Sequence, residues 1–136
     1  MTELHIPLIA ALANGGWTYA TGRLHALIDG AVTDIIVMPP DGVFLQTLRI
    51  KCILGTSQGL HVTLYRTAKA DWGGTNSFDP IATQAMTGPA IINQSISLTA
   101  SGKNVVDNSI YNYSVRVTAA TTPPDMLHVA EIALLY

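Results

Sequence analysis

The chain has 136 residues, the usual size of one folded domain, and its formal net charge is −2. Charged residues make up 12% of it and hydrophobic residues 49%, whereas about 25% of an average soluble domain is charged. Lys and Arg are scattered along the chain, which excludes the clustered basic surface that nucleic acid requires. No apolar run approaches the roughly 20 residues of a membrane-spanning helix. We therefore expect neither a nucleic-acid partner nor a membrane partner.

The shortage of charge also bears on assembly. Monomers rarely expose apolar patches of more than a few hundred Å². We therefore expect copies of the chain to cover part of one another's surface. The alternative is that Ser, Thr, Asn and Gln side chains solvate the surface in place of charges.

The N-terminal quarter has a less regular pattern than the rest. Residues 4–13 are rich in Ala and Leu and suit either a short helix or a strand, whereas residues 17–27 predict one strand. We interpret residues 1–16 as an N-terminal docking arm. Residues 1–7 lack the positively charged start of a signal peptide, so we expect no cleaved leader.

Two strands joined by a turn are predicted next. Residues 31–38 are rich in Val and Ile, and residues 39–42, Pro-Pro-Asp-Gly, are typical of a turn. Residues 43–54 alternate with a period of two, which places Arg49 and Lys51 on the outward face. The predicted core-facing set is Phe44, Gln46, Leu48, Ile50, Cys52 and Leu54.

The middle of the chain predicts a hairpin and a loop. Residues 55–59 have the length of a hairpin loop, and residues 60–67 alternate as a return strand would. Residues 70–89 hold glycine, proline and small polar residues, and we predict a long surface loop there. Residues 90–99 predict a further strand.

The C-terminal third is the clearest part. Residues 111–118 alternate, residues 121–125 interrupt regular structure, and residues 127–136 are apolar on both faces. Such a final strand is central in its sheet or lies at an interface. Short strands, frequent turns and no long helical pattern predict one all-β domain over residues 1–136, an antiparallel β-sandwich of the jelly-roll type.

Motifs for chemistry are missing from the sequence. It contains no G-x-S-x-G nucleophile motif and no phosphate-binding glycine loop. Its four histidines are far apart, and the single cysteine, Cys52, falls in an apolar strand where a buried structural thiol is expected. We therefore predict no catalytic residue, no metal ligand and no cofactor-binding residue, and we expect that the protein is not an enzyme.

The predicted long loop holds the candidate contact residues Trp72, Asn76, Phe78 and Asp79. Aromatic rings beside amide and carboxylate groups are typical of sugar-binding loops. The same side chains also suit a loop that packs on a neighbouring subunit. The sequence leaves both roles open.

Three passages together resemble a known class of proteins. They are residues 39–44, residues 60–66, and the closing pair of residues 110–117 and 129–136. Their pattern resembles the small trimeric jelly-roll domains of bacteriophage tail fibres, head fibres and capsid decoration proteins. The resemblance implies a homotrimer without cofactors, located in the virion and in contact with other virion proteins. The chain departs from that class in its Trp72 loop and in lacking a coiled-coil shaft, which favours a stand-alone virion component over a tail fibre.

Two functions follow as expectations. The first is a virion structural protein, a jelly-roll subunit that oligomerises to decorate a capsid or to form part of a phage tail or fibre. The alternative is a carbohydrate-binding module that recognises a surface glycan through the Trp72 loop.

Overall fold

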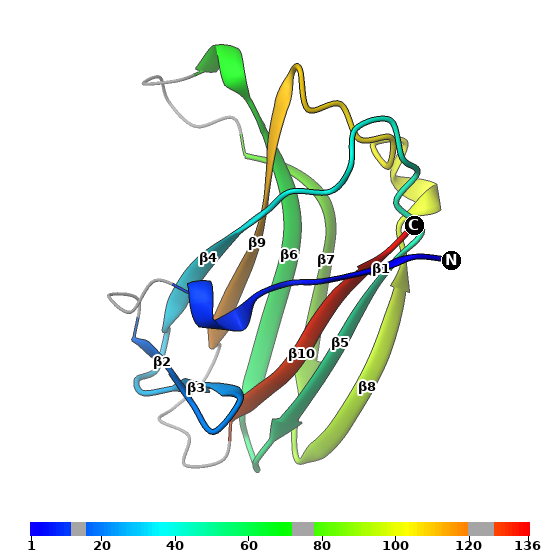
Figure 1. Ribbon diagram of the computed structural model, residues 1–136. Coiled ribbons are helices and arrows are strands. Elements are labelled where there is room, and N and C mark those ends of the chain that lie inside the picture. Colours follow the sequence, from blue (N-terminus) through cyan, green and yellow to red (C-terminus); the bar gives the residue numbers. More distant parts are fainter. Residues whose placement is uncertain (12–15, 72–77, 120–126) are drawn as a thin grey trace.

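Two antiparallel β-sheets pack face to face in the computed structural model (Figure 1). The structure describes residues 1–11, 16–71, 78–119 and 127–136. In these ranges, no helix is long and apolar enough to cross a membrane. The predicted all-β sandwich is confirmed, and its arrangement is jelly-roll-like.

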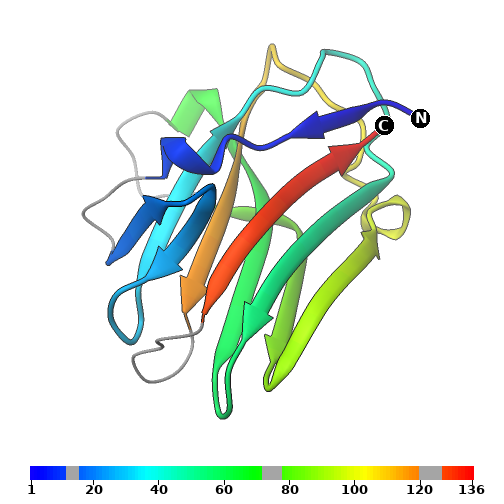
Figure 2. The same cartoon turned by 60° about the horizontal axis from the view of Figure 1, so that its bottom comes forward.

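The first sheet is built around the C-terminal strand, β10 (His128–Leu135). Its strand order is β2-β3-β10-β5-β8, and β1 pairs with the end of β10 that β3 does not reach. Figure 2 shows β1 alongside this end of β10, close to both termini. The other strands are β1 (Glu3–His5), β2 (Trp17–Ala20), β3 (Arg23–Ala26), β5 (Thr47–Leu54) and β8 (Ala90–Ser97). The expectation that an apolar closing strand is central is therefore confirmed, because β10 has neighbours on both sides.

The second sheet has the order β4-β9-β6-β7. Its strands are β4 (Val32–Val37), β6 (Gly59–Ala68), β7 (Asp79–Thr87) and β9 (Tyr111–Ala119). Within the described residues, short 3-10 helices lie in the connections: η1 (Leu8–Ala10), η3 (Lys69–Asp71) and η4 (Thr99–Ser101). β9 and β6 lie in the middle of this sheet, and their outward side chains form the floor of the site described below.

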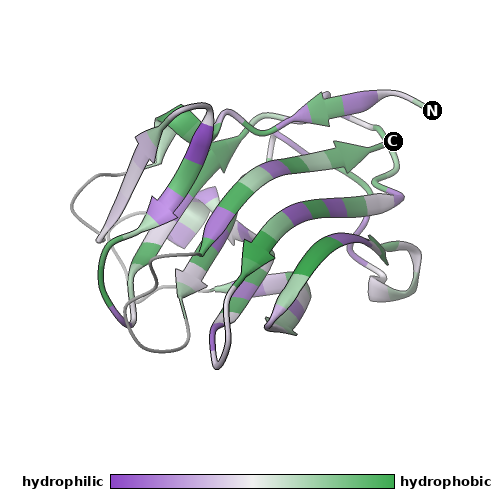
Figure 3. Ribbon diagram, turned by 90° about the horizontal axis from the view of Figure 1, so that it is seen from below, coloured by the Kyte–Doolittle hydropathy of each residue, from purple (hydrophilic) through white to green (hydrophobic). Residues whose placement is uncertain are grey.

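The core fills the space between the sheets. Hydrophilic and hydrophobic residues alternate along β5 in Figure 3, and the side chains of Leu48, Ile50, Cys52 and Leu54 are buried, as predicted. β6 and β9 contribute Leu60, Val62, Leu64, Tyr113, Val115 and Val117 from the other sheet. Each such aliphatic side chain contributes roughly 1.5–3 kcal/mol through its burial.

The first half of the predicted strand at residues 43–54 is different. The strand begins at Thr47, and Leu45 is buried whereas Phe44 is 60% exposed, the reverse of the predicted faces. The Leu45 N–H donates to the Asn104 carbonyl oxygen, and the Gln46 N–H donates to that of Leu135. Residues 43–46 therefore belong to a connection between the sheets, where the period of two does not hold.

The predicted hairpin at residues 55–59 is wrong, because β5 and β6 lie in different sheets. Gln58 stabilises this crossover: its Oε1 accepts from the Gly55 N–H at 2.5 Å, and its carbonyl accepts from the Gly88 N–H at 2.9 Å. A Cβ on Gly88 would lie 2.2 Å from the Gly55 carbonyl oxygen, so this close approach requires glycine. A short loop suits a hairpin and a step between stacked sheets equally well, so loop length did not distinguish them.

The predicted loop at residues 70–89 is also wrong over its second half, which forms the nine-residue strand β7. Pro80 is a residue type that usually ends a strand. It is tolerated because β7 is an edge strand and because the register with β6 shifts between Leu64 and Tyr65, opposite Pro80. Trp72 and Asn76 lie outside the described residues, as do residues 121–125.

Residues 17–27 form two strands instead of the predicted one. Thr21 and Gly22 have positive φ values of 53° and 76°. Two consecutive residues with positive φ are typical of a tight two-residue hairpin turn, which here joins β2 to β3.

Residues 3–10 contain both a strand and a short helix. β1 pairs with β10, and the side chains of Ile6 and Leu8 are buried in the domain core. The docking role of residues 1–16 stays a prediction; the structure describes residues 1–11 and 16 of this segment, and β1 and η1 pack on their own domain.

Candidate functional site

Phe78 lies on the outer face of the second sheet, where it stacks on Tyr65 of β6. The two ring centroids are 4.1 Å apart and the planes make an angle of 29°. Tyr65 is 7% exposed, whereas Phe78 is 40% exposed. A stack of this kind stabilises both rings and holds the more exposed ring, Phe78, in one orientation. Phe78 is therefore a pre-positioned aromatic surface.

Arg116 of β9 lies beside this stack and is paired with Asp34 of β4. Arg116 Nε donates to Asp34 Oδ1 at 2.8 Å and Nη2 donates to Oδ2 at 2.9 Å. The guanidinium carbon lies 4.2 Å from the Phe78 ring centroid and 5.8 Å from that of Tyr65. A cation at this distance is attracted to the face of the ring. The fork of two hydrogen bonds and the ring contact together hold Arg116 in place.

The register of three strands brings these side chains together. Asp34 is directly opposite Arg116, and Tyr65 is directly opposite Ser114 on the neighbouring strand. All four side chains point outward, because their strand neighbours Ile35, Leu64 and Val115 fill the core. The site thus depends on β4, β9 and β6 lying side by side.

Two pKa values reflect this setting. The hydrogen bonds to Asp34 raise the pKa of Arg116, which remains charged at every physiological pH. Burial raises the pKa of the Tyr65 hydroxyl, which forms hydrogen bonds with Ser114 and Asp34. The cluster therefore offers a phenol with a raised pKa and a guanidinium that stays charged, beside the Asp34 side chain.

A groove of about 370 Å³ runs next to this cluster. It is lined by Ala10, Asp34, Ile36, Tyr65 and Ser114. Ile36 is 73% exposed and gives the groove an apolar side, while Asp34 and Ser114 supply polar atoms. Apolar walls with a few convergent polar groups are typical of sites for small ligands or for single units of a polymer.

Asp79, the other predicted contact residue within the described ranges, has a different environment. It forms ion pairs with Arg66, at 2.9 Å, and with Lys103. The hydrogen bond from Lys103, and to a smaller extent the one from Arg66, lowers the pKa of the Asp79 carboxyl. The Arg66 guanidinium also lies 4.0 Å from the centroid of the Tyr111 ring. The Asp79 carboxylate is thus held at the end of the sandwich by its own domain, and its contact with a partner stays a prediction.

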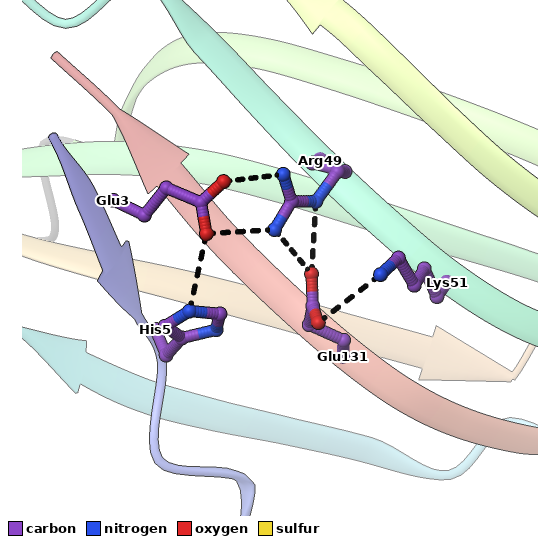
Figure 4. A network of polar contacts seen from close by, with 5 residues as sticks. All are labelled: Glu3, His5, Arg49, Lys51 and Glu131. Atoms are coloured by element: carbon purple, nitrogen blue, oxygen red, sulfur yellow. Dashed lines mark hydrogen bonds and ion pairs between the residues drawn. The ribbon is translucent and has the colours of Figure 1, made fainter. Parts of the chain in front are cut away.

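The outer face of the first sheet carries a second polar cluster, shown in Figure 4. Arg49 donates two hydrogen bonds to Glu3, at 2.8 and 3.1 Å, and a third to Glu131 at 2.8 Å. Lys51 lies 3.4 Å from Glu131, and His5 lies 3.2 Å from Glu3. The cluster joins β1, β10 and β5 across the sheet. A pocket of about 290 Å³ lies beside it, with His5, Tyr19 and Glu131 in its lining.

The residues that the structure describes form neither a cluster of metal ligands nor a reactive thiol site. Among them, no three His, Cys, Asp or Glu side chains come together as a metal site requires. Cys52 is buried, and burial raises the pKa of its thiol to about 11, which keeps it protonated. His25 and His128 lie in contact, with ring centroids 4.1 Å apart.

The sequence analysis missed the partners of Phe78. Alternation does place Tyr65, Ser114 and Arg116 on outward strand faces, so part of the signal was present. It does not say which strands are neighbours, and Asp34 and Arg116 are 82 residues apart. The pairing of β4 with β9 and of β9 with β6 was needed to find the cluster.

Comparison with known proteins supports the fold. No family model matches the sequence, and no curated protein sequence matches it either. Among solved structures, the chain is similar to the xylan-binding module CBM15, with a TM-score of 0.56 and 12% sequence identity. The similarity covers 98% of this chain and 95% of that one.

The similar structure is a carbohydrate-binding module and not a phage protein. At this identity the likeness shows the fold alone. The β-sandwich that the phage resemblance implied is therefore confirmed, whereas its viral and trimeric parts stay predictions.

Proposed function

We propose that this protein is a carbohydrate-binding domain that holds a glycan on the outer face of the second sheet. The observation that carries the proposal is the stack of Phe78 on Tyr65 beside the Arg116–Asp34 pair, at the edge of a groove of about 370 Å³. The resemblance of the whole chain to a xylan-binding module supports it at the level of the fold.

The proposed roles follow from the chemistry of sugars. A pyranose ring has C–H groups on its faces, which pack on an aromatic ring, and hydroxyl groups around its edge, which need donors and acceptors. Phe78 is the exposed ring, Arg116 and Ser114 donate hydrogen bonds, and Asp34 accepts them. Asp34 and Arg116 cancel in charge, which favours a neutral glycan. The predicted contacts of Trp72 and Asn76, in the segment directly before Phe78, are part of the same proposal.

Binding without cleavage is the expected activity. Glycoside hydrolysis usually requires two carboxyl groups, about 5–5.5 Å apart in retaining enzymes and about 6.5–9.5 Å apart in inverting ones. Among the described residues that line the groove, Asp34 is the one carboxylate, and Arg116 holds both of its oxygens. We expect no release of reducing sugar from any glycan that the protein binds.

The test is titration calorimetry with soluble xylan, mannan and mixed-linkage glucan, preceded by a glycan array. Phe78→Ala is expected to weaken the binding of the recognised glycan about tenfold, which corresponds to about 1.4 kcal/mol. Phe44→Ala is the matched control, because Phe44 is also exposed and lies in the connection before β5, where it bridges to Val105. The proposal is wrong if the unmodified protein binds no glycan, or if both variants bind as it does.

A virion structural role is the second candidate, favoured by exposed large hydrophobic residues on a protein with little charge. Met38 is 83% exposed and Ile91 is 87% exposed, and contacts with further copies or other virion proteins would cover such side chains. This role does not exclude glycan binding. Electron microscopy of particles labelled with an antibody against the chain tests it, and unlabelled particles would contradict it.

A further inference from the structure

The free edges of the two sheets differ in how they are protected. Strands at an edge present unpaired N–H and C=O groups, and proteins usually shorten, cover, kink or charge them. β2 is four residues long, and β7 contains Pro80 and a shift in register. β4 carries Asp34 and shares pockets with the N-terminal segment, through Pro7 and Ala10. These three edges are poor templates for pairing with another strand.

β8 has none of these protections. It lies at the end of the first sheet, where Figures 1 and 2 show it on the outside of the sandwich. Its eight residues, Ala-Ile-Ile-Asn-Gln-Ser-Ile-Ser, include no charge and no proline. Its register with β5 runs without a shift from Ala90 to Ser97. The edge is therefore long, regular and uncharged.

The side chains of β8 are also incompletely covered. Ile92 and Ile96 point to the core but are only partly buried, because β8 is the last strand of its sheet. On the outer face, Ile91 is 87% exposed, and Asn93 and Ser95 are exposed as well. A further strand beside β8 would bury more of both isoleucines that face the core.

The charges nearest to this edge balance one another. In the register of β8 with β5, Ser95 lies opposite Arg49, and Asn93 lies opposite Lys51. Arg49 and Lys51 form ion pairs with Glu3 and Glu131, so two positive and two negative charges cancel. Two copies that meet at β8 would therefore bring together surfaces whose charges are already paired, so like charges would not oppose the contact.

We propose that β8 pairs antiparallel with β8 of a second copy, so that the first sheets of two molecules form one continuous sheet. Antiparallel pairing of a strand with itself is two-fold symmetric, and it gives each outward backbone group a partner. A second copy is favoured over a charged peptide because β8 has no charge with which to select one. The groove on the second sheet stays open in this dimer, so glycan binding and dimerisation are independent.

Light scattering coupled to size exclusion, at micromolar to millimolar concentrations, tests the proposal on the full chain. The unmodified protein is expected to have twice the mass of one chain. Ser95→Lys is expected to be monomeric, because each copy then brings a new positive charge to an edge that has none. Ala85→Lys is the matched control, since Ala85 is an exposed, outward residue of the other long edge strand, β7, and this variant is expected to stay dimeric.

Hydrogen exchange provides a second readout that does not depend on a substitution. The amides of β8 are expected to exchange more slowly as the protein concentration rises, whereas those of β7 are not. A monomer at all concentrations overturns the proposal, and so does an oligomer, trimeric or otherwise, that Ser95→Lys leaves unchanged. Neither result affects the test of Phe78, which measures glycan binding alone.

Discussion

The two outer faces of the sandwich both contain an arginine that holds a carboxylate with two hydrogen bonds, but the surroundings of the two arginines differ. Arg49 on the first sheet contacts Glu3 and Glu131 and so ties β1 to β10 and β5. Arg116 on the second sheet contacts Asp34, and it also lies over the exposed ring of Phe78. The same kind of ion pair joins strands on one face and lies beside the proposed binding surface on the other.

The difference teaches that an ion pair does not reveal its role by itself. Surface ion pairs contribute little to stability, so their neighbours decide what they do. Both clusters have a cavity beside them. Around Arg49 the contacting groups are charged side chains already paired with one another. Arg116 also contacts the exposed ring of Phe78, which offers an apolar surface to a ligand. Three experiments test this contrast.

Removing each arginine should separate the two faces most clearly. Arg116→Ala is expected to weaken glycan binding about a hundredfold, about 2.7 kcal/mol, because it removes a hydrogen-bond donor and the support of Phe78. Arg49→Ala is expected to leave binding unchanged. Calorimetry with the glycan identified for the unmodified protein measures both. Equal losses in the two variants would contradict the contrast.

Acid should loosen the first face. The hydrogen bonds to Arg49 lower the pKa of Glu3 below its ordinary value of 4.5. Burial raises the pKa of Glu131, but the hydrogen bonds from Arg49 and Lys51 outweigh it and lower the pKa overall. Carboxyl groups with lowered pKa values stabilise the folded state above pH 4.5 and lose this contribution as the pH falls below it.

The expected result is a lower hydrogen-exchange protection of the Ile6 amide, which bonds to Ile132, as the pH falls below 4.5. Glu3→Gln is the control, because it removes the charge at every pH and should show the lower protection throughout. A protection factor that does not change with pH in the unmodified protein would mean that the cluster does not hold β1.

Tyr65→Phe should have the smallest effect of the three. The ring that supports Phe78 remains, while the hydroxyl that bonds to Ser114 and Asp34 is lost. Glycan binding is expected to weaken about threefold, which corresponds to about 0.6 kcal/mol. Calorimetry measures it beside Phe78→Ala, and a loss as large as that of Phe78→Ala would show that Tyr65 contacts the ligand directly.

Much of the fold followed from local patterns. The strands at β4, β6, β8, β9 and β10 were predicted because their side chains alternate or are apolar throughout. The errors fall where a local signal has two structural meanings. Pro80 ends most strands but is tolerated in an edge strand, and a short loop such as residues 55–58 suits both a hairpin and a crossover.

The site was predicted in smaller part. Composition around residue 78 predicts an aromatic contact surface; Phe78 is exposed and stacks on Tyr65, which lines the groove, and its contact with a ligand or partner stays a prediction. Tyr65, Asp34 and Arg116 were not linked to it, because they come from three strands that are distant in sequence. Position in the chain groups Asp79 with Phe78, whereas the ion pairs of its carboxylate with Arg66 and Lys103 could not be predicted, because Arg66 and Lys103 are distant in sequence.

The sequence by itself determined that this protein is an all-β sandwich with little charge, because a period of two in hydropathy is a local property that needs no knowledge of neighbours. Which strands lie side by side was decided only in the tertiary structure, by the way that both sheets bury their apolar faces against each other. That arrangement brings Asp34 to Arg116 and leaves β8 at an open edge. The two surfaces proposed to bind a glycan and a second copy therefore arise from pairing between distant strands, which no local pattern encodes.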